Sequence, residues 1–201
     1  TARDEYKGEL GIFMDANESP YENGYNRYPD PYQKALKEQI SAIKGIAAEN
    51  IFIGNGSDEA IDMVFRVFCE PRMDNVVAIA PSYGMYKVAA AINDVEIREV
   101  QLGEEYSLPV EEILAATDKN TKALFLCSPN NPTGNSFPRE AILRLADEFE
   151  GMVVVDEAYI DFAEAESLKS EIAQRPNLIV LQTMSKAWAM AGLRVGLALA
   201  D

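Results

Sequence analysis

One lysine in this sequence has surroundings in which it could act as a nucleophile. Lys186 stands between Ser185 and a mostly small, apolar segment that ends at Arg194, and it follows an apolar run at 178–181 that is typical of a buried strand. An amine that loses contact with water is driven towards its neutral form, which can form a Schiff base with an aldehyde. The same pattern fits a surface lysine at the start of a helix, so other segments have to distinguish the two.

A glycine-containing turn at 54–59 lies between a predicted strand and a predicted helix. Its two glycines permit a tight turn, Ser57 is expected to be the N-cap, and the N–H groups of the next helical turn form an anion site. Because the side chains of Asp58 and Glu59 would repel an anion, the backbone amides must hold it. The turn matches neither the dinucleotide-binding nor the P-loop motif, and a plain turn and cap is the alternative.

Three further strand ends carry polar or aromatic side chains. Tyr83 could lie flat against a planar ligand, although an aromatic residue there also fits simple packing. The loop at 128–134 has two prolines and two adjacent asparagines, of which Asn131 is the second, and a pure turn is the alternative. Asp156 ends an apolar strand and Tyr159 follows it. A buried carboxylate must be paired or hydrogen-bonded, so a magnesium ligand and an N-cap are alternatives for Asp156.

The alternation of apolar runs with helical patterns predicts how these residues are positioned. Strands are expected at 51–53, 76–80, 95–102, 122–127, 152–155, 178–181 and 195–199, and helices at 31–44, 57–68, 83–92, 110–116, 139–149 and near 167–173. Repeated strand–helix units with continuous apolar strands predict a mainly parallel sheet covered on both faces, a three-layer α/β/α sandwich. Ligands bind at the carboxyl ends of the strands in such sheets, which is where the five segments lie.

Composition excludes several classes of function. The 201 residues carry a net charge of -15, which argues against nucleic acid and anionic membranes as partners, and no apolar run approaches the ~20 residues of a membrane span. Cys69 and Cys127 lie in unrelated apolar segments and are expected to be reduced core residues of a cytoplasmic protein. The chain has no histidine, so no metal site is predicted and acid–base chemistry falls to Lys, Tyr, Asp or Glu.

Taken together, the five segments require one particular kind of ligand. It must be planar and phosphorylated, carry an aldehyde for Lys186, and have a basic ring nitrogen for Asp156. Pyridoxal 5′-phosphate has all four properties. A phosphate-binding or interaction module on the same kind of sheet would explain the turn at 54–59, but not Lys186, Asp156 and Asn131 together.

The chain also resembles the class II, fold-type I pyridoxal-phosphate-dependent aminotransferases, and among them most closely the histidinol-phosphate aminotransferase family. The resemblance rests on residues 15–18, 27–30, 56–59, 83–86, 128–134, 156–159 and 185–194. It implies the transamination of histidinol phosphate with 2-oxoglutarate in histidine biosynthesis, by a homodimer. The alternatives are another fold-type I enzyme, such as an aromatic aminotransferase or threonine-phosphate decarboxylase, and a non-catalytic fragment.

The resemblance assigns roles around the cofactor ring. Lys186 would bind the cofactor as a Schiff base and then act as general base, and Asp156 would pair with the ring nitrogen. Tyr83 would stack on the ring. Asn131 and Tyr159 would bind the ring's 3′-oxygen.

The resemblance also assigns the phosphate site and the domain organisation. The phosphate would be held by the backbone of Ser57 and Asp58 and by the side chains of Ser185 and Arg194, with Tyr28 reaching it across a homodimer interface. Residues 1–30 are rich in turn formers and are expected to form an N-terminal arm, and residues 31–201 the cofactor-binding large domain. The family continues into a small C-terminal domain with substrate-binding arginines, so we expect these residues alone to bind cofactor weakly and to turn over little.

Overall fold

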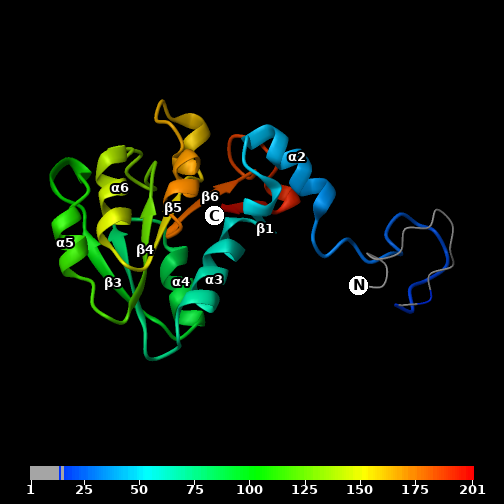
Figure 1. The fold of residues 1–201 in the computed structure, drawn as a ribbon, viewed down its shortest axis with the longest axis horizontal. Helices are drawn as coiled ribbons and strands as arrows, with labels where there is room; N and C mark the ends of the chain where they lie inside the picture. The colour runs from blue at the N-terminus through cyan, green and yellow to red at the C-terminus, as the bar shows by residue number, and fades with distance from the viewer. Residues whose placement is uncertain (1–13, 15) are drawn as a thin grey trace.

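The computed structural model describes residues 14 and 16–201, which form a seven-stranded sheet with helices on both faces (Figure 1). The strands are β1 (Ile51–Asn55), β2 (Asn75–Ala80), β3 (Glu96–Gln101), β4 (Thr121–Cys127), β5 (Met152–Asp156), β6 (Leu178–Thr183) and β7 (Val195–Leu199). The α-helices are α2 (Lys34–Lys44), α3 (Ser57–Phe68), α4 (Met85–Ile92), α5 (Val110–Ala115) and α6 (Arg139–Glu148). The 3-10 helices are η1 (Ala48–Asn50), η2 (Glu104–Tyr106), η3 (Ile160–Phe162), η4 (Leu168–Gln174) and η5 (Ala191–Leu193). Among the described helices, none is long and apolar enough to cross a membrane.

The strand order places the ends of distant segments side by side. The order across the sheet is β1-β7-β6-β5-β4-β2-β3, and β7 runs antiparallel to both of its neighbours while the other pairs are parallel. This confirms the mainly parallel sheet. Since β7 alone is reversed, it begins at the edge where the other strands end, and Arg194 immediately precedes it. Arg194 therefore lies at the edge predicted to bind a ligand.

Two apolar clusters, one on each face of the sheet, form the core. Alternate residues of β5 point to opposite faces, so Val153 and Val155 belong to the cluster under α2, α5, α6 and η4, and Val154 to the cluster under α3 and α4. In the second cluster the Phe65 and Phe125 rings stack with their centroids 5.1 Å apart. The sheet is thus the middle layer of the predicted three-layer sandwich.

Three predicted helices differ from those found by more than one residue at an end, or in type. The first begins at Lys34 rather than 31, because Gln33 has φ +51°, outside the helical region, and the Asp30 carboxylate accepts the N–H groups of Tyr32 and Lys34, each at 2.9 Å. The helix predicted from residue 83 begins at Met85, with Gly84 as its N-cap. The helix expected near 167–173 is the 3-10 helix η4.

The two cysteines differ in burial. Cys127 is buried at the end of β4, where burial raises the pKa of its thiol to about 12, and Cys69 is half-buried beyond α3. Both are free thiols, as the sequence predicts, but Cys69 is only partly in the core because α3 has already ended.

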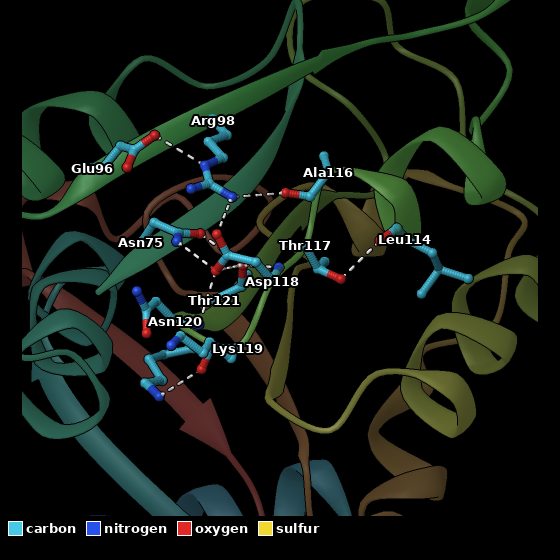
Figure 2. A network of polar contacts seen from close by, with 11 residues as sticks. Asn75, Glu96, Arg98, Leu114, Ala116, Thr117, Asp118, Lys119, Asn120 and Thr121 are labelled. Atoms are coloured by element: carbon cyan, nitrogen blue, oxygen red, sulfur yellow. Dashed lines mark hydrogen bonds and ion pairs between the residues drawn. The ribbon is translucent and has the colours of Figure 1, made fainter. Parts of the chain in front are cut away.

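A network of polar contacts lies at the amino ends of β2 and β4, opposite to the carboxyl ends of the strands (Figure 2). The Asp118 carboxylate accepts from the side chain of Asn75 at 3.0 Å and from the N–H of Asn120 at 2.8 Å, and lies 2.9 Å from the Arg98 guanidinium. The Thr121 hydroxyl donates to the Asn75 side-chain oxygen at 2.7 Å. The hydrogen bond from Asn75, with the others, holds the pKa of Asp118 well below its usual value. The network joins the starts of β2 and β4 to the loop between α5 and β4.

Candidate functional site

The carboxyl edge of the sheet brings together five residues that the sequence singled out. Lys186 follows β6, Asp156 ends β5 and Tyr159 comes three residues later. The Lys186 amine lies 5.5 Å from the centroid of the Tyr159 ring, and its charge acts on the Asp156 carboxyl. From the other side of the site, the Tyr83 hydroxyl donates to the Asp58 carboxylate at 3.0 Å. The arrangement groups an amine, a buried carboxyl and two phenols at this edge. The Lys186 side chain is exposed, so the loss of water contact expected from the sequence is wrong for this chain, because the small side chains next to it do not cover it.

Asp156 is a carboxyl group held out of water. It is 2% exposed, and burial raises its pKa to about 6, while hydrogen bonds from the Tyr86 hydroxyl (2.9 Å) and the Ala158 N–H (3.0 Å) oppose the rise. A carboxyl tuned in this way can pair with a basic ring nitrogen and share its proton.

Sequence reasoning missed Tyr86, which hydrogen-bonds Asp156 from α4. A signal was present, because a tyrosine on the apolar face of a buried helix needs a partner for its hydroxyl. That partner is 70 residues away, however, and the sequence pattern does not identify it. The side chain is 1% exposed and stacks on Phe125, which fixes the direction of the hydroxyl.

The turn before α3 is built for close approach of the backbone. Gly56 has φ +80°, and its N–H donates to the Arg194 carbonyl at 2.8 Å. A Cβ at Gly56 would collide with the Arg194 guanidinium, and a Cβ at Gly196 of β7 would collide with the backbone of Gly56 and Ser57. The guanidinium lies 3.8 Å from the Asp58 carboxylate and 3.4 Å from the Asn55 carbonyl. The start of α3 and Arg194 thus form one cationic corner.

The prediction that Ser57 is the N-cap is wrong. Gly56 holds that position and Ser57 is the first helical residue, because only a glycine fits between Arg194 and the approaching strand β7. No side chain caps α3, and the Glu59 carboxylate turns back to the backbone and side-chain N–H groups of Asn55, the latter at 3.0 Å. The first-turn amides are therefore not used by a cap, which suits an anion.

Ser185 supplies an independent indication of a missing partner. Its hydroxyl is buried and has no hydrogen-bond partner among the described residues, while its N–H is satisfied by the Thr183 hydroxyl at 3.1 Å. A buried hydroxyl without a partner costs free energy unless a ligand supplies one. With the amides of α3 and Arg194, the donor set suits a phosphate group, so the residues present fit pyridoxal phosphate.

The two asparagines of the loop at 128–134 differ in their contacts. Asn130 holds the loop in place: its side-chain nitrogen donates to the Pro81 carbonyl (3.0 Å) and the Thr133 hydroxyl (2.7 Å). Both asparagines line a hollow of about 390 Å³ together with Tyr159. Asn131 therefore lies on the same hollow as the tyrosine that the sequence paired with it, while the side-chain nitrogen of Asn130 is already used within the loop.

Tyr28 is the one predicted site residue that this chain does not bring to the others. Its side chain is 69% exposed, and its N–H donates to the Glu18 carboxylate at 2.7 Å within the arm. The described part of the arm extends away from the sheet beyond α2 (Figure 1). A contact of Tyr28 across an interface stays a prediction. Within the described residues, no group of three or more acidic or cysteine side chains is arranged to hold a metal ion.

Comparison with known proteins places this geometry in context. A family model described as aminotransferase class I and II matches residues 13–201. The histidinol-phosphate aminotransferase of Bacteroides thetaiotaomicron is 57% identical over 202 residues, which cover 100% of this chain and 58% of that protein. That of Parabacteroides distasonis is 55% identical over 201 residues, with the same two coverages. The chain therefore spans somewhat less than three-fifths of the length of these relatives.

Solved structures show the same fold. The histidinol-phosphate aminotransferase of Sinorhizobium meliloti, in complex with pyridoxal-5′-phosphate, has a TM-score of 0.79 and 28% identity over 87% of this chain and 48% of that one. The L-threonine-O-3-phosphate decarboxylase of Porphyromonas gingivalis has a TM-score of 0.73 and 26% identity over 87% of this chain and 54% of that one. The likeness thus extends to two reactions on phosphorylated amino compounds.

Proposed function

The chain belongs to the aminotransferase class I and II family, and from this premise we propose that it is the cofactor-binding part of a histidinol-phosphate aminotransferase. The observation that carries the proposal is the grouping of Lys186, Asp156 and Tyr159 beside the uncapped start of α3. The names of the relatives at 55–57% identity support histidinol phosphate as the amino donor, and 2-oxoglutarate is proposed as the acceptor.

In the proposed mechanism, bound pyridoxal phosphate serves as an electron sink for the substrate's α-carbon. The Lys186 amine would hold the cofactor and would take the substrate's α-proton as general base. The Asp156 carboxylate would balance the charge of the ring nitrogen, and the buried Tyr86 hydroxyl donates a hydrogen bond that holds that carboxylate in place. Tyr159 and Asn131 would bind the ring oxygen, and Tyr83 would cover the ring face.

The phosphate end of the cofactor would be held without any metal. The first-turn amides of α3, at Ser57 and Asp58, the Ser185 hydroxyl and the Arg194 guanidinium supply the donors. The Arg194 guanidinium lies 3.8 Å from the Asp58 carboxylate, which is longer than a hydrogen bond. This end anchors the ligand, so that Lys186 and Asp156 can act at the ring.

The test is covalent capture of the cofactor. The protein is mixed with pyridoxal phosphate and treated with borohydride, which reduces the lysine–cofactor link to a stable amine, and the labelled peptide is identified by mass spectrometry. We expect the label at Lys186, and we expect Lys186→Ala to lose this label and, in the complete polypeptide, to lose steady-state transamination. Turnover by the alanine variant would overturn the proposal.

The substrate is decided by a separate assay on the complete polypeptide. Histidinol phosphate, threonine phosphate and aromatic amino acids are offered as donors, with 2-oxoglutarate as acceptor. We expect transamination of histidinol phosphate to be fastest. Release of carbon dioxide from threonine phosphate would instead favour the decarboxylase reaction named for the similar Porphyromonas gingivalis structure.

A further inference from the structure

A buried lysine far from Lys186 in the sequence lies next to the lysine segment. Lys44, the last residue of α2, is 7% exposed. Its amine lies 5.1 Å from the centroid of the Trp188 ring and 3.9 Å from the Asp161 carboxylate. The indole N–H of Trp188 donates to that same carboxylate at 3.0 Å. Each of the three side chains contacts the other two, and we refer to them as the Lys44–Asp161–Trp188 cluster.

The cluster joins the two segments that carry the proposed chemistry. Trp188 lies two residues after Lys186, and Asp161 lies two residues after Tyr159. In the part of the chain that the structure describes, the backbone between Lys186 and η5 is held by hydrogen bonds within the segment itself. The N–H of Ala189 donates to the Lys186 carbonyl and that of Met190 to the Met184 carbonyl, both at 3.0 Å. Side-chain contacts must therefore fix where this segment lies.

Packing alone does not account for a charge at position 44. Burial lowers the pKa of Lys44, and Asp161 opposes that effect, so desolvation works against the ammonium form. The other charges that face it are those of Lys169 and Glu157, and the Lys169 amine donates to the Lys44 carbonyl. A methionine would occupy a similar volume without that cost. The contacts that only a cation makes are those with the Trp188 ring and the Asp161 carboxylate.

We infer that the Lys44–Asp161–Trp188 cluster is a positioning device that holds the segment after Lys186 against the segment after Asp156. It thereby sets where the Lys186 amine points relative to Tyr159 and Asp156. Lys44 is a positioning residue, since it acts through Trp188 and not on a reacting atom. The importance of the Lys186 position for catalysis rests on the proposed function. The restraint of the segment by the cluster does not depend on that function.

The restraint is tested by amide hydrogen exchange without cofactor. In Lys44→Met we expect residues 159–163 and 184–194 to exchange about threefold to tenfold faster, the scale of a desolvated cation–aromatic contact. Lys44→Arg keeps a cation and should restore slow exchange. Lys122→Met is the matched control, because Lys122 pairs with Asp74 at 3.6 Å and lies at the amino end of β4. Unchanged exchange at both segments in folded Lys44→Met would overturn the inference.

The positioning role is tested on the complete polypeptide with pyridoxal phosphate. In Lys44→Met we expect the borohydride-fixed label on Lys186, relative to that on other lysines, to fall severalfold, and the absorbance of the lysine-bound cofactor to titrate at a different pH. Lys44→Arg should restore both, and a purely structural residue would change neither in a folded protein. If the wild type labels Lys186 and Lys44→Met labels it equally, the inference fails. If the wild type does not label Lys186, the proposed function fails, and hydrogen exchange still decides the restraint.

Discussion

At the scale of single residues, the buried carboxyl of Asp156 lowers the stability of the protein, although the proposed function needs it. Its pKa is about 6 in the folded chain against an ordinary value of 3.8, so the folded state holds its proton more tightly than the unfolded state. Stability is unaffected below the lower value, falls as the pH rises between the two values, and stays reduced above about 6. The ligand-free protein thus bears a cost that a cationic ring nitrogen would relieve.

Asp156→Asn should therefore stabilise the ligand-free protein at pH 7.5. About two pKa units at 1.36 kcal/mol each give an upper estimate of roughly 3 kcal/mol. The gain should shrink towards zero at pH 4, and urea unfolding of both proteins at the two pH values measures it. Asp118→Asn is a control of opposite sign. A lowered pKa makes the Asp118 carboxylate stabilising at both pH 7.5 and pH 4, because that stabilisation is lost only as the pH falls below the ordinary value of 3.8. A gain from Asp156→Asn that is equal at both pH values would contradict the argument.

Gly56→Ala tests the cationic corner at the start of α3. The substitution puts a Cβ against the Arg194 guanidinium at a positive φ, so we expect pyridoxal phosphate to bind about tenfold more weakly, equivalent to ~1.4 kcal/mol. Gly45→Ala is the matched control: it also has a positive φ, at +67°, but nothing within 4 Å of the added Cβ. Gly45→Ala should lose about 1 kcal/mol of stability and Gly56→Ala more, because its Cβ also collides with Arg194, and only Gly56→Ala should lose affinity. Equal affinities would remove this corner from the binding site.

At the scale of elements, local patterns predicted most of the sheet and helices but not how they pair. The helix predicted at 57–68 is α3 (Ser57–Phe68), because Ile61, Val64 and Phe65 repeat at helical spacing and all face the core. The antiparallel direction of β7 has no local signal, since it depends on pairing with β1 and β6. The partner of Tyr86 and the N-cap role of Gly56 could not be predicted either, because both depend on contacts between distant segments. The types of the site residues were readable, whereas their contacts depend on the three-dimensional fold.

Thr121→Val tests whether the polar network of Figure 2 contributes to stability alone. Without the hydroxyl, the side-chain oxygen of Asn75 and the N–H of Asp118 lose a partner, which should cost about 1–3 kcal/mol in urea unfolding. Thr117→Val, which removes a single local bond to the Leu114 carbonyl, should cost less. Because the network is at the opposite edge of the sheet, the affinity for pyridoxal phosphate should not change. A loss of affinity in Thr121→Val would show that the two edges are coupled.

At the scale of the whole molecule, apolar surface remains where the arm meets the domain. Ile40 of α2 is buried against the sheet, but Leu36 and Ile43, which flank it on the helix, are 42% and 54% exposed. Tyrosines continue this surface along the arm at Tyr21, Tyr25, Tyr28 and Tyr32. Several large exposed apolar side chains in one part of a chain are typical of an interface. A second copy of the chain covering it is the arrangement in which Tyr28 could reach a site.

The double variant Leu36→Glu/Ile43→Glu tests this arrangement in the complete polypeptide. For the homodimer that the family resemblance implies, we expect the double substitution to give a monomer in light scattering, because two charges would be buried in an apolar contact. Met73→Glu, which charges an exposed apolar side chain in the turn before β2, should leave the dimer intact. If Tyr28 contributes across the interface, the monomer should also bind pyridoxal phosphate more weakly, and Tyr28→Phe should reproduce that loss without dissociating the dimer. A double variant that remains dimeric would place the interface elsewhere and leave Tyr28 without a route to the site.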